Sequence, residues 1–176
     1  MFIAATKALI RPLQPSDADA LSEIFRAAWT EAYSGILPAD FIRRQTERRA
    51  PQWWRDVSAR RPAATSTQSP IVLEVDGIVA GYTLVGPSRA PPRRNLGEIY
   101  ELYLAPEFQG QGYGEFLFEG ARATLDSANA TGLVVWVLEA NIRAQQFYWA
   151  RGGRPFARRR ENLFGRAVGL VGYDFG

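Results

Sequence analysis

The chain of 176 residues contains neither cysteine nor histidine. Without cysteine it forms no disulfide, no thiolate nucleophile and no cysteine-ligated zinc or iron–sulfur site. Without histidine it lacks the most frequent general base and metal ligand, which excludes the Ser-His-Asp and Cys-His catalytic arrangements. We therefore expect no metal site. We expect any catalysis to use carboxylates, tyrosine, serine or threonine, backbone groups or a bound cofactor.

Lysine and long apolar runs are also scarce. Lys7 is the single lysine among 21 cationic side chains and lies in a predicted terminal tail, which argues against a lysine Schiff-base enzyme. The longest apolar run, residues 133–138, is too short to span a membrane. The N-terminal apolar stretch is interrupted by Lys7 and is too short for a secretory signal, so we expect an intracellular, cytoplasmic protein.

The charges are distributed unevenly around a net charge of +3. Arginines gather at residues 158–160 and in an earlier group that comprises Arg43, Arg44, Arg48, Arg49, Arg55, Arg60 and Arg61. Residues 95–141 hold seven acids and a single base, Arg122. The arginine groups fit two interpretations: solvated helix faces, or a site for an anionic ligand or partner.

Hydrophobic periodicity predicts a single α/β domain over residues 1–176, without internal repeats. The expected strands are 9–13, 71–75, 78–85, 98–104, 133–138, 154–160 and 167–175, and Asp76-Gly77 marks a hairpin. The expected helices are one capped by Ser16, an Arg-rich one that ends near Arg60, and those over residues 112–128 and 141–151. Loops are expected at 62–69 and 86–95.

A glycine-rich turn between a strand and a helix is the strongest chemical signal. In Gln109-Gly-Gln-Gly-Tyr-Gly114 several backbone N–H groups and a helix dipole converge, which suits a pyrophosphate. The spacing does not fit the dinucleotide fingerprint G-x-G-x-x-G, and the Gly-Lys-Ser/Thr of a P-loop is absent. A plain strand-to-helix connection remains the alternative for the turn alone.

Two separated motifs extend this signal into a family resemblance. Gln109-x-x-Gly112-x-Gly114 resembles the Q/R-x-x-G-x-G/A motif of the GNAT superfamily of N-acetyltransferases. Asn141-x-x-Ala144-x-x-Phe147-Tyr148-x-x-x-Gly152 is similar to its second signature, and Trp29-x-x-x-Tyr33-x-Gly35-Ile-Leu-Pro38 to openings common among its members. The resemblance covers nearly the whole chain. It implies an α/β GNAT fold: a mixed, mostly antiparallel sheet of about seven strands, splayed between the fourth and fifth, with about four helices.

The resemblance also implies acetyl-CoA as cosubstrate and assigns residues to it. The backbone of Leu102, Tyr103 and Leu104 would pair with the pantetheine arm. The turn that would hold the pyrophosphate comprises Gln109, Gly110, Gln111, Gly112, Tyr113, Gly114 and Glu115. Asn141 would bond the pantetheine arm, act as a helix cap, or do both.

Three residues are candidates for catalysis. Glu98 lies eleven residues before Gln109, a spacing that resembles the general-base glutamate of the histone-acetylating branch. Glu101 is its rival, because a β-bulge in this strand could turn either side chain toward the cleft; alternatively, both face solvent. Tyr148 matches the family's general acid, the alternative being a core aromatic beside Phe147. Since no cysteine can carry an acetyl group, we expect direct attack by the acceptor in a ternary complex.

The chain departs from the family pattern at two positions. Gly152-Gly153 replaces the usual Gly-Phe, which could alter packing near the substrate cleft. Trp136 stands where peptide-acetylating relatives carry a glutamate, which weakens a close match to that subgroup.

The acceptor is less defined than the cosubstrate. The acidic middle of the chain favours a cationic amine. Trp29, Tyr33, Trp53 and Trp54 could line an acceptor wall or belong to the core. Two other functions stay open: an acyl-CoA-binding or partner-binding protein with little catalysis, and an Arg-rich RNA-binding module. The latter lacks an aromatic-basic RNA signature, so no nucleic-acid partner is expected. A homodimer is left open, and no membrane partner is expected.

Overall fold

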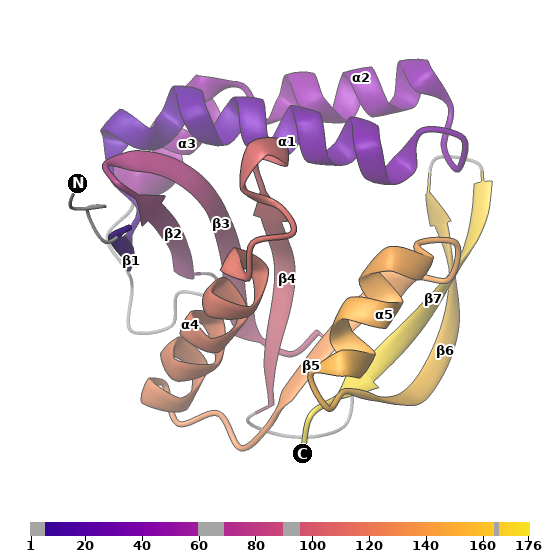
Figure 1. Cartoon of the computed structure of the whole chain (residues 1–176). Coiled ribbons are helices and arrows are strands. Elements are labelled where there is room, and N and C mark those ends of the chain that lie inside the picture. Colours follow the sequence, from indigo (N-terminus) through magenta and orange to yellow (C-terminus); the bar gives the residue numbers. More distant parts are fainter. Residues whose placement is uncertain (1–5, 60–68, 90–95, 164–165) are drawn as a thin grey trace.

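The computed structural model describes residues 6–59, 69–89, 96–163 and 166–176. Within these ranges seven strands form one sheet in the order β1-β2-β3-β4-β5-β7-β6 (Figure 1). The strands are β1 (Ala8–Pro12), β2 (Ser69–Val75), β3 (Ile78–Pro87), β4 (Gly97–Leu104), β5 (Leu133–Leu138), β6 (Arg154–Leu163) and β7 (Arg166–Asp174). The helices are α1 (Ala18–Tyr33), α2 (Ala39–Arg48), α3 (Pro51–Ala59), α4 (Tyr113–Ser127) and α5 (Ile142–Ala150). Among the described residues, no helix combines the length and apolar character needed to cross a bilayer.

The centre of the sheet is split. β4 and β5 form its parallel pair, and they are paired over three positions, from Gly97 with Leu133 to Ile99 with Val135. Beyond these positions the two strands diverge, while β4 stays bonded to β3 and β5 to β7 (Figure 1). The other pairings in the described sheet are antiparallel. The mixed sheet splayed between its fourth and fifth strands is therefore confirmed.

A β-bulge in β4 changes which side chains face each side of the sheet. Leu84 pairs with Glu101, but the next residue, Val85, pairs with Ile99, so Tyr100 is the extra residue. Ile99 packs against Phe118 of α4, whereas Tyr100 belongs to the cluster under α1. Since a bulge interrupts the alternation of side chains, Glu101 shares the face of Tyr100 instead of returning to that of Ile99.

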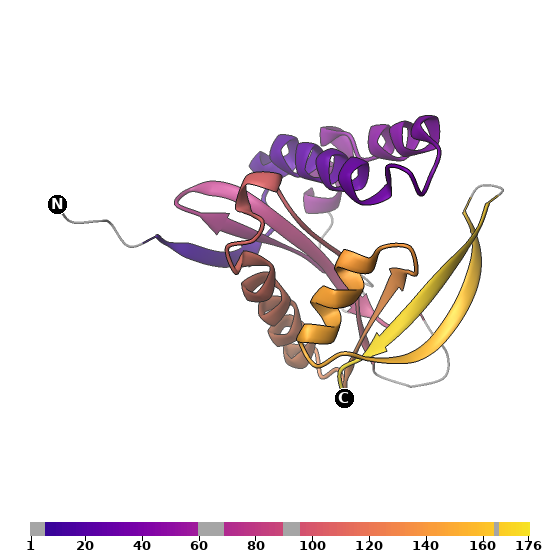
Figure 2. The ribbon, with the colours of Figure 1, turned by 45° about the vertical axis from the view of Figure 1, so that its right-hand side comes forward.

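Helices cover both faces of the sheet and form separate cores. On one face, Leu21 and Phe25 of α1 and Trp54 of α3 pack on Tyr82 and Leu84 of β3. On the other face, α4 and α5 lie side by side (Figure 2), and Phe118 of α4 meets Tyr148 of α5. These two layers hold β4 between them and so fix both sides of the split.

The Arg-rich segment forms two helices rather than the single helix expected up to Arg60. α2 ends at Arg48, and α3 begins at Pro51. Proline disfavours helical geometry in the residue before it and has no N–H to continue a helix, which explains the break at Arg49 and Ala50. The described chain thus has five α-helices where about four were expected. Arg60, Arg61 and most of the loops expected at 62–69 and 86–95 lie outside the described residues.

The first helix also starts later than expected. Ser16 lies inside a 3₁₀ turn, Pro15–Asp17, and α1 begins at Ala18. The Asp17 carboxylate is buried and accepts hydrogen bonds from the Gln14 backbone and from both terminal nitrogens of Arg11, each at 2.8 Å. Burial by itself would raise the pKa of Asp17. The hydrogen bonds together outweigh that effect, so the pKa lies below its usual range. This ion pair fixes the turn, and Ser16 is not the cap.

Candidate active site

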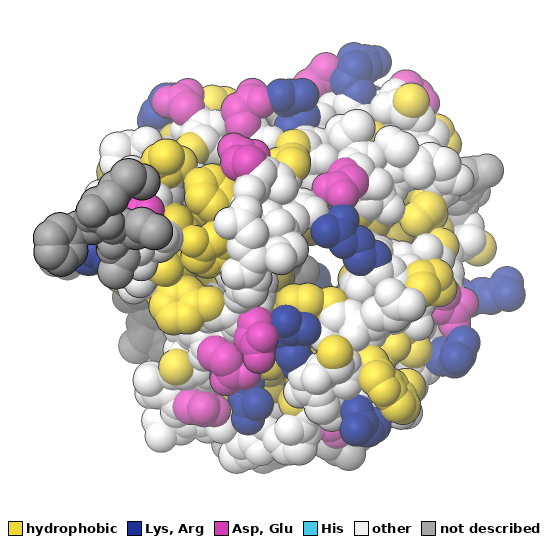
Figure 3. Space-filling view, in the orientation of Figure 1, with side chains coloured by type: hydrophobic (Ala, Val, Ile, Leu, Met, Phe, Trp, Pro, Cys, Tyr) yellow, Lys and Arg dark blue, Asp and Glu magenta, His cyan; other side chains and the backbone are white. Residues whose placement is uncertain are grey.

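A cavity of about 1050 Å³ lies where β4 and β5 separate. Figure 3 shows it as a hollow near the middle of this face of the molecule. α1, β4, the glycine-rich turn, β5 and α5 supply its walls. The candidate residues that line it are Glu101, Leu102, Tyr103, Leu104, Gln109, Gly110, Gly112, Gly114, Glu115, Asn141 and Tyr148. Glu98, Gln111 and Tyr113 are not among the lining residues.

The glycine-rich turn has the geometry of an anion site. Gly110 and Gly112 adopt left-handed φ angles of +73° and +86°, which other residues avoid, and Gly112 is the N-terminal cap of α4. The first N–H groups of a helix have no carbonyl of that helix to bond, and they carry the positive end of its dipole. The Glu115 N–H already bonds the Gly112 carbonyl at 3.1 Å. The pyrophosphate contacts expected over residues 109–115 stay a prediction, in which the N–H groups of residues 110–114 are the ones not engaged by this bond.

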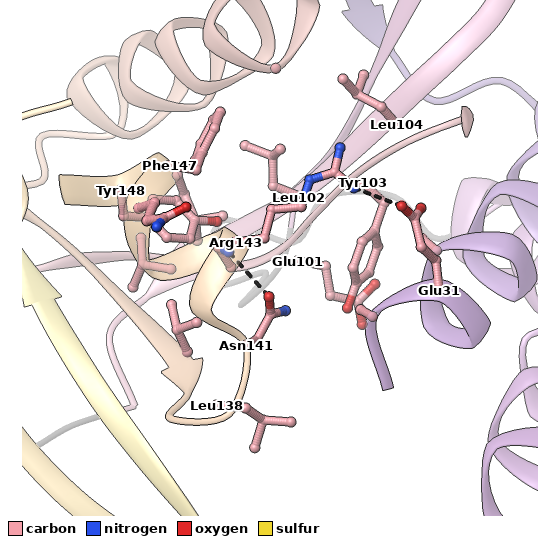
Figure 4. A pocket seen from close by; sticks show the side chains of 18 of the residues that line it. Glu31, Glu101, Leu102, Tyr103, Leu104, Leu138, Asn141, Arg143, Phe147 and Tyr148 are labelled. Atoms are coloured by element: carbon pink, nitrogen blue, oxygen red, sulfur yellow. Dashed lines mark hydrogen bonds and ion pairs between the residues drawn. The ribbon is translucent and has the colours of Figure 1, made fainter. Parts of the chain in front are cut away.

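Three side chains from distant parts of the chain form a hydrogen-bonded cluster: Glu31, Gln109 and Arg143. Arg143 donates to Glu31 at 2.6 Å and to Gln109 at 2.6 Å, and Gln109 donates to Glu31 at 3.1 Å. Figure 4 shows the pair between Arg143 of α5 and Glu31 of α1 beside the pocket. Glu31 and Arg143 are 112 positions apart, so sequence reasoning had no local pattern that would have found them.

Glu101 is held inside the cavity wall by two donors. Arg49 donates to one carboxylate oxygen at 2.7 Å, and the Tyr82 hydroxyl donates to the other at 2.9 Å. The carboxylate side chain is 14% exposed. Burial raises the pKa of Glu101 above its usual range, although Arg49 and Tyr82 partly offset that effect. A carboxylate with a raised pKa and access to a cavity has the properties of a general base.

Glu98 has a different environment. Its side chain is completely buried and lies under Arg89, whose backbone N–H donates at 2.7 Å and whose guanidinium donates at 2.6 and 3.0 Å. Three charge-assisted hydrogen bonds occupy the carboxylate. Its catalytic role stays a prediction, but this geometry gives it no direct contact with the cavity.

Tyr148 lies on the opposite wall from Glu101, on α5 (Figure 4). It is buried against Phe118 and Tyr173 and still lines the cavity. Burial, together with the nearby Tyr33, raises the pKa of its phenol well above the usual value. The hydroxyl is therefore protonated at neutral pH and can donate a hydrogen bond into the cavity.

Asn141 acts as the cap of α5, since its side-chain oxygen accepts a hydrogen bond from the Ala144 N–H at 3.1 Å. Its amide nitrogen is not used in that bond, so the cap leaves a donor on a residue that lines the cavity.

Gly153, where the family resemblance led us to expect a phenylalanine, lies against the ring of Phe175. A Cβ on Gly153 would lie 2.7 Å from the ring of Phe175, and that ring packs against Phe118 and Tyr148. Phe175 thus supplies an aromatic side chain beside the candidate acid.

The four aromatic residues expected at an acceptor wall have different positions. Trp29 and Tyr33 line the main cavity. Trp54 is completely buried between Trp53 and Tyr82 and belongs to the core. Trp53 lines a second, smaller cavity beside α2. Within the described ranges, no group of three or more acidic side chains is placed to hold a metal ion.

Comparisons with known proteins agree on one family. Residues 19–152 match the acetyltransferase (GNAT) family. An uncharacterised N-acetyltransferase of Archaeoglobus fulgidus is 27% identical over 138 residues, which cover 77% of this chain and 88% of that protein. A spermidine N(1)-acetyltransferase of Thermoplasma acidophilum is 25% identical over 146 residues, or 81% and 86% of the two chains. The crystal structure of PaiA N-acetyltransferase from the same organism, in complex with coenzyme A, has a TM-score of 0.75 and 19% identity, and the match covers 96% of this chain and 99% of that one.

Proposed function

The chain belongs to the GNAT family of N-acetyltransferases, and from this premise we propose that it moves the acetyl group of acetyl-CoA to a primary amine of a small molecule or peptide. One observation carries the proposal. The cavity between β4 and β5 brings a glycine-rich anion site, a carboxylate of raised pKa and a protonated phenol to the same space. The acetyltransferase relatives, one of which is named for spermidine, support an amine as the acceptor class.

The cosubstrate would lie along β4. Beyond Ile99 this strand is bonded to β3 on one side and has left β5 on the other. An extended pantetheine arm can pair with that edge at Leu102, Tyr103 and Leu104, as a strand would. The pyrophosphate would then meet the N–H groups of residues 110–114. No metal takes part in this scheme. An acetyl-CoA-dependent reaction also fits the cytoplasmic location expected from the sequence.

Glu101 is the general base in this proposal. An amine acceptor is mostly an ammonium ion at neutral pH, and it must lose a proton before its nitrogen can attack the thioester carbonyl. Glu101 can take this proton directly or through water, because its carboxylate lies in the cavity wall. Glu98 is the alternative general base. It would act only indirectly, because Arg89 covers its carboxylate.

Tyr148 is the general acid in this proposal. A C–N bond forms between amine and acetyl carbon, and the C–S bond breaks to release the thiolate of coenzyme A. Tyr148 gives its proton to that sulfur and regains one from solvent. The ammonium loses two protons, one before the attack and one from the tetrahedral adduct, and both pass through Glu101 to solvent. Since Tyr148 takes one proton back from solvent, the net products are the amide, the free thiol and one proton. The chain has no cysteine to form an acetyl-enzyme, which supports direct attack in a ternary complex.

The test is thiol release from acetyl-CoA over a panel of primary amines, with the acetylated product identified by mass spectrometry. Because the protein has no cysteine, a thiol reagent reports coenzyme A alone. We expect amine-dependent release of thiol and a matching amount of acetylated amine. Tight acetyl-CoA binding without transfer to any amine would instead favour a cofactor-binding or partner-binding role.

A further inference from the structure

A second cavity, of about 440 Å³, lies beside the main one and on the far side of Glu101. Its lining comes from α1, α2, α3 and β4 and comprises Phe25, Trp29, Gln45, Arg48, Arg49, Trp53 and Glu101. Trp29 and Glu101 line both cavities, so the proposed general base stands at the boundary between them. We call this second space the basic cavity.

The basic cavity contains hydrogen-bond donors that the protein leaves unused. The Arg49 Nη1 and Trp29 Nε1 atoms are buried and have no partner in the described part of the chain. Arg48 is exposed and makes no ion pair with any described acid. Buried donors without partners are costly, and a native fold keeps few of them. Two of the six such atoms in the described part of the chain belong to residues that line this cavity, where a bound ligand would supply the acceptor atoms.

Arg49 is held so that part of its guanidinium is left for such a ligand. Its Nη2 donates to Glu101 at 2.7 Å, and its Cζ lies 3.8 Å from the centre of the Trp53 ring. Stacking and the ion pair fix the orientation of the group, which lowers the entropy that binding must remove. The free Nη1 then presents a charged donor in a desolvated space, where its attraction to an anion is strong.

The charges of the cavity favour an anion over a cation. Glu101 is the single acid among the lining residues, and Arg49 and Tyr82 already occupy its oxygens. Seven acids in the middle of the chain suggested a cationic acceptor, and four of them have arginine partners: Glu98 pairs with Arg89, Glu101 with Arg49, Glu115 with Arg151, and Glu139 with Arg158. The cavity next to the proposed base is therefore basic.

We propose that the basic cavity binds an anionic group, in the simplest case a carboxylate, on the same molecule as the acceptor amine. The inference rests on the proposed acetyl transfer and narrows its acceptor to the class of amino acids and their relatives. The amine would lie at Glu101 facing the thioester. The carboxylate would accept hydrogen bonds from Arg49 and Trp29, and the charge of Arg48 would attract it.

The direct experiment compares acceptors that differ in the anion alone. We would measure kcat/KM for α-amino acids and for ω-amino acids of increasing length, each against its carboxamide. The length series is needed because the span between amine and anion is set by the distance between the two cavities. For at least one amino acid, kcat/KM should exceed that of its carboxamide by about tenfold or more. Equal rates throughout, or a preference for amides or diamines, would overturn the anion site and leave the acetyltransferase activity standing.

A matched pair of variants assigns the preference to this cavity. Arg48→Gln should reduce the acid-to-amide ratio of kcat/KM by about fivefold, the modest value expected for an exposed charge. Arg44→Gln removes the same charge from the same helix, but Arg44 pairs with Asp40 and does not line the cavity. It should leave the ratio as it is. An equal change in both variants, or in neither, would contradict the assignment.

A binding measurement separates this proposal from acetyl transfer itself. An N-acetylated amino acid and its carboxamide are titrated against the protein, with tryptophan fluorescence as the readout, because Trp29 and Trp53 line the cavity. The acid should bind more tightly, and Arg48→Gln should shrink the difference. This result without transfer to any amine would refute the proposed activity and keep the anion site. Equal binding of acid and amide would refute the site.

Discussion

Replacing Gly112 by alanine should weaken acetyl-CoA binding. Gly112 has φ +86°, and a Cβ placed there would meet no atom within 4 Å, so the strain comes from the backbone alone. The left-handed conformation costs an L-residue about 1–2 kcal/mol. If the turn relaxes to avoid that cost, binding must restore it, and the dissociation constant rises by about 5-fold to 30-fold. A methyl group would also keep a phosphate oxygen from the backbone, which acts in the same direction.

Gly77 offers a matched control. Its φ is +82°, and a Cβ built on it would likewise meet no atom within 4 Å. It lies in the turn between β2 and β3 and does not line the cavity. Gly77→Ala should cost stability without changing acetyl-CoA affinity. Titration calorimetry with acetyl-CoA gives the affinities, and urea unfolding gives the stabilities. Acetyl-pantetheine, which has no pyrophosphate, should bind the wild type, Gly112→Ala and Gly77→Ala with equal affinity. Unchanged acetyl-CoA affinity in Gly112→Ala would show that this turn does not hold the pyrophosphate.

Three further predictions concern single side chains. Tyr148→Phe should lower kcat by about 10²-fold to 10³-fold with little change in acetyl-CoA affinity, and unchanged turnover in rapid-quench assays would remove Tyr148 from the mechanism. Glu101 is active when ionised and its pKa is raised, so kcat/KM should fall as pH decreases through that raised value; in Glu101→Gln this acidic limb should vanish, and its persistence would assign the base elsewhere. Asp17→Asn should lower the free energy of unfolding in urea by about 2 kcal/mol, because it weakens one charged partner of Arg11, which keeps its ion pair with Glu74. Folding lowers the pKa of Asp17, so the ionised carboxylate stabilises the fold at pH values above its unfolded-state pKa. This stabilisation is lost as the pH falls through its folded-state pKa. A difference in free energy of unfolding between wild type and Asp17→Asn that does not change with pH would contradict this prediction.

Local sequence patterns predicted the elements that surround the site. The strand at residues 133–138 is observed with the bounds expected, and the helices after the glycine-rich turn and after Asn141 are shorter than expected by a residue or two. These segments combine short-range signals: apolar runs, glycines at turns and a side-chain cap. The split between β4 and β5 was predicted through the family resemblance, not from periodicity.

Contacts between distant segments could not be predicted. Glu101 reaches Arg49 because of the bulge at Tyr100, and a bulge depends on the register with β3 rather than on the residues of β4 alone. Arg49 also follows the last residue of α2, and the sequence alone gave no reason to single it out from the other arginines of that group. Its half-buried, stacked position became visible with α1, α3 and β4 packed around it. The distinction between Glu98 and Glu101 follows from the same packing.

A single turnover measured by mass spectrometry tests acetyl transfer in this cavity most directly. The protein is held in excess over acetyl-CoA, and the acetyl group is followed with and without the best amine acceptor. We expect one free thiol and one acetylated amine per acetyl-CoA when the amine is present, with no acetylated protein at any time. An acetyl group that first appears on the protein and then moves to the amine, or no transfer from bound acetyl-CoA, would contradict direct attack by an amine between β4 and β5.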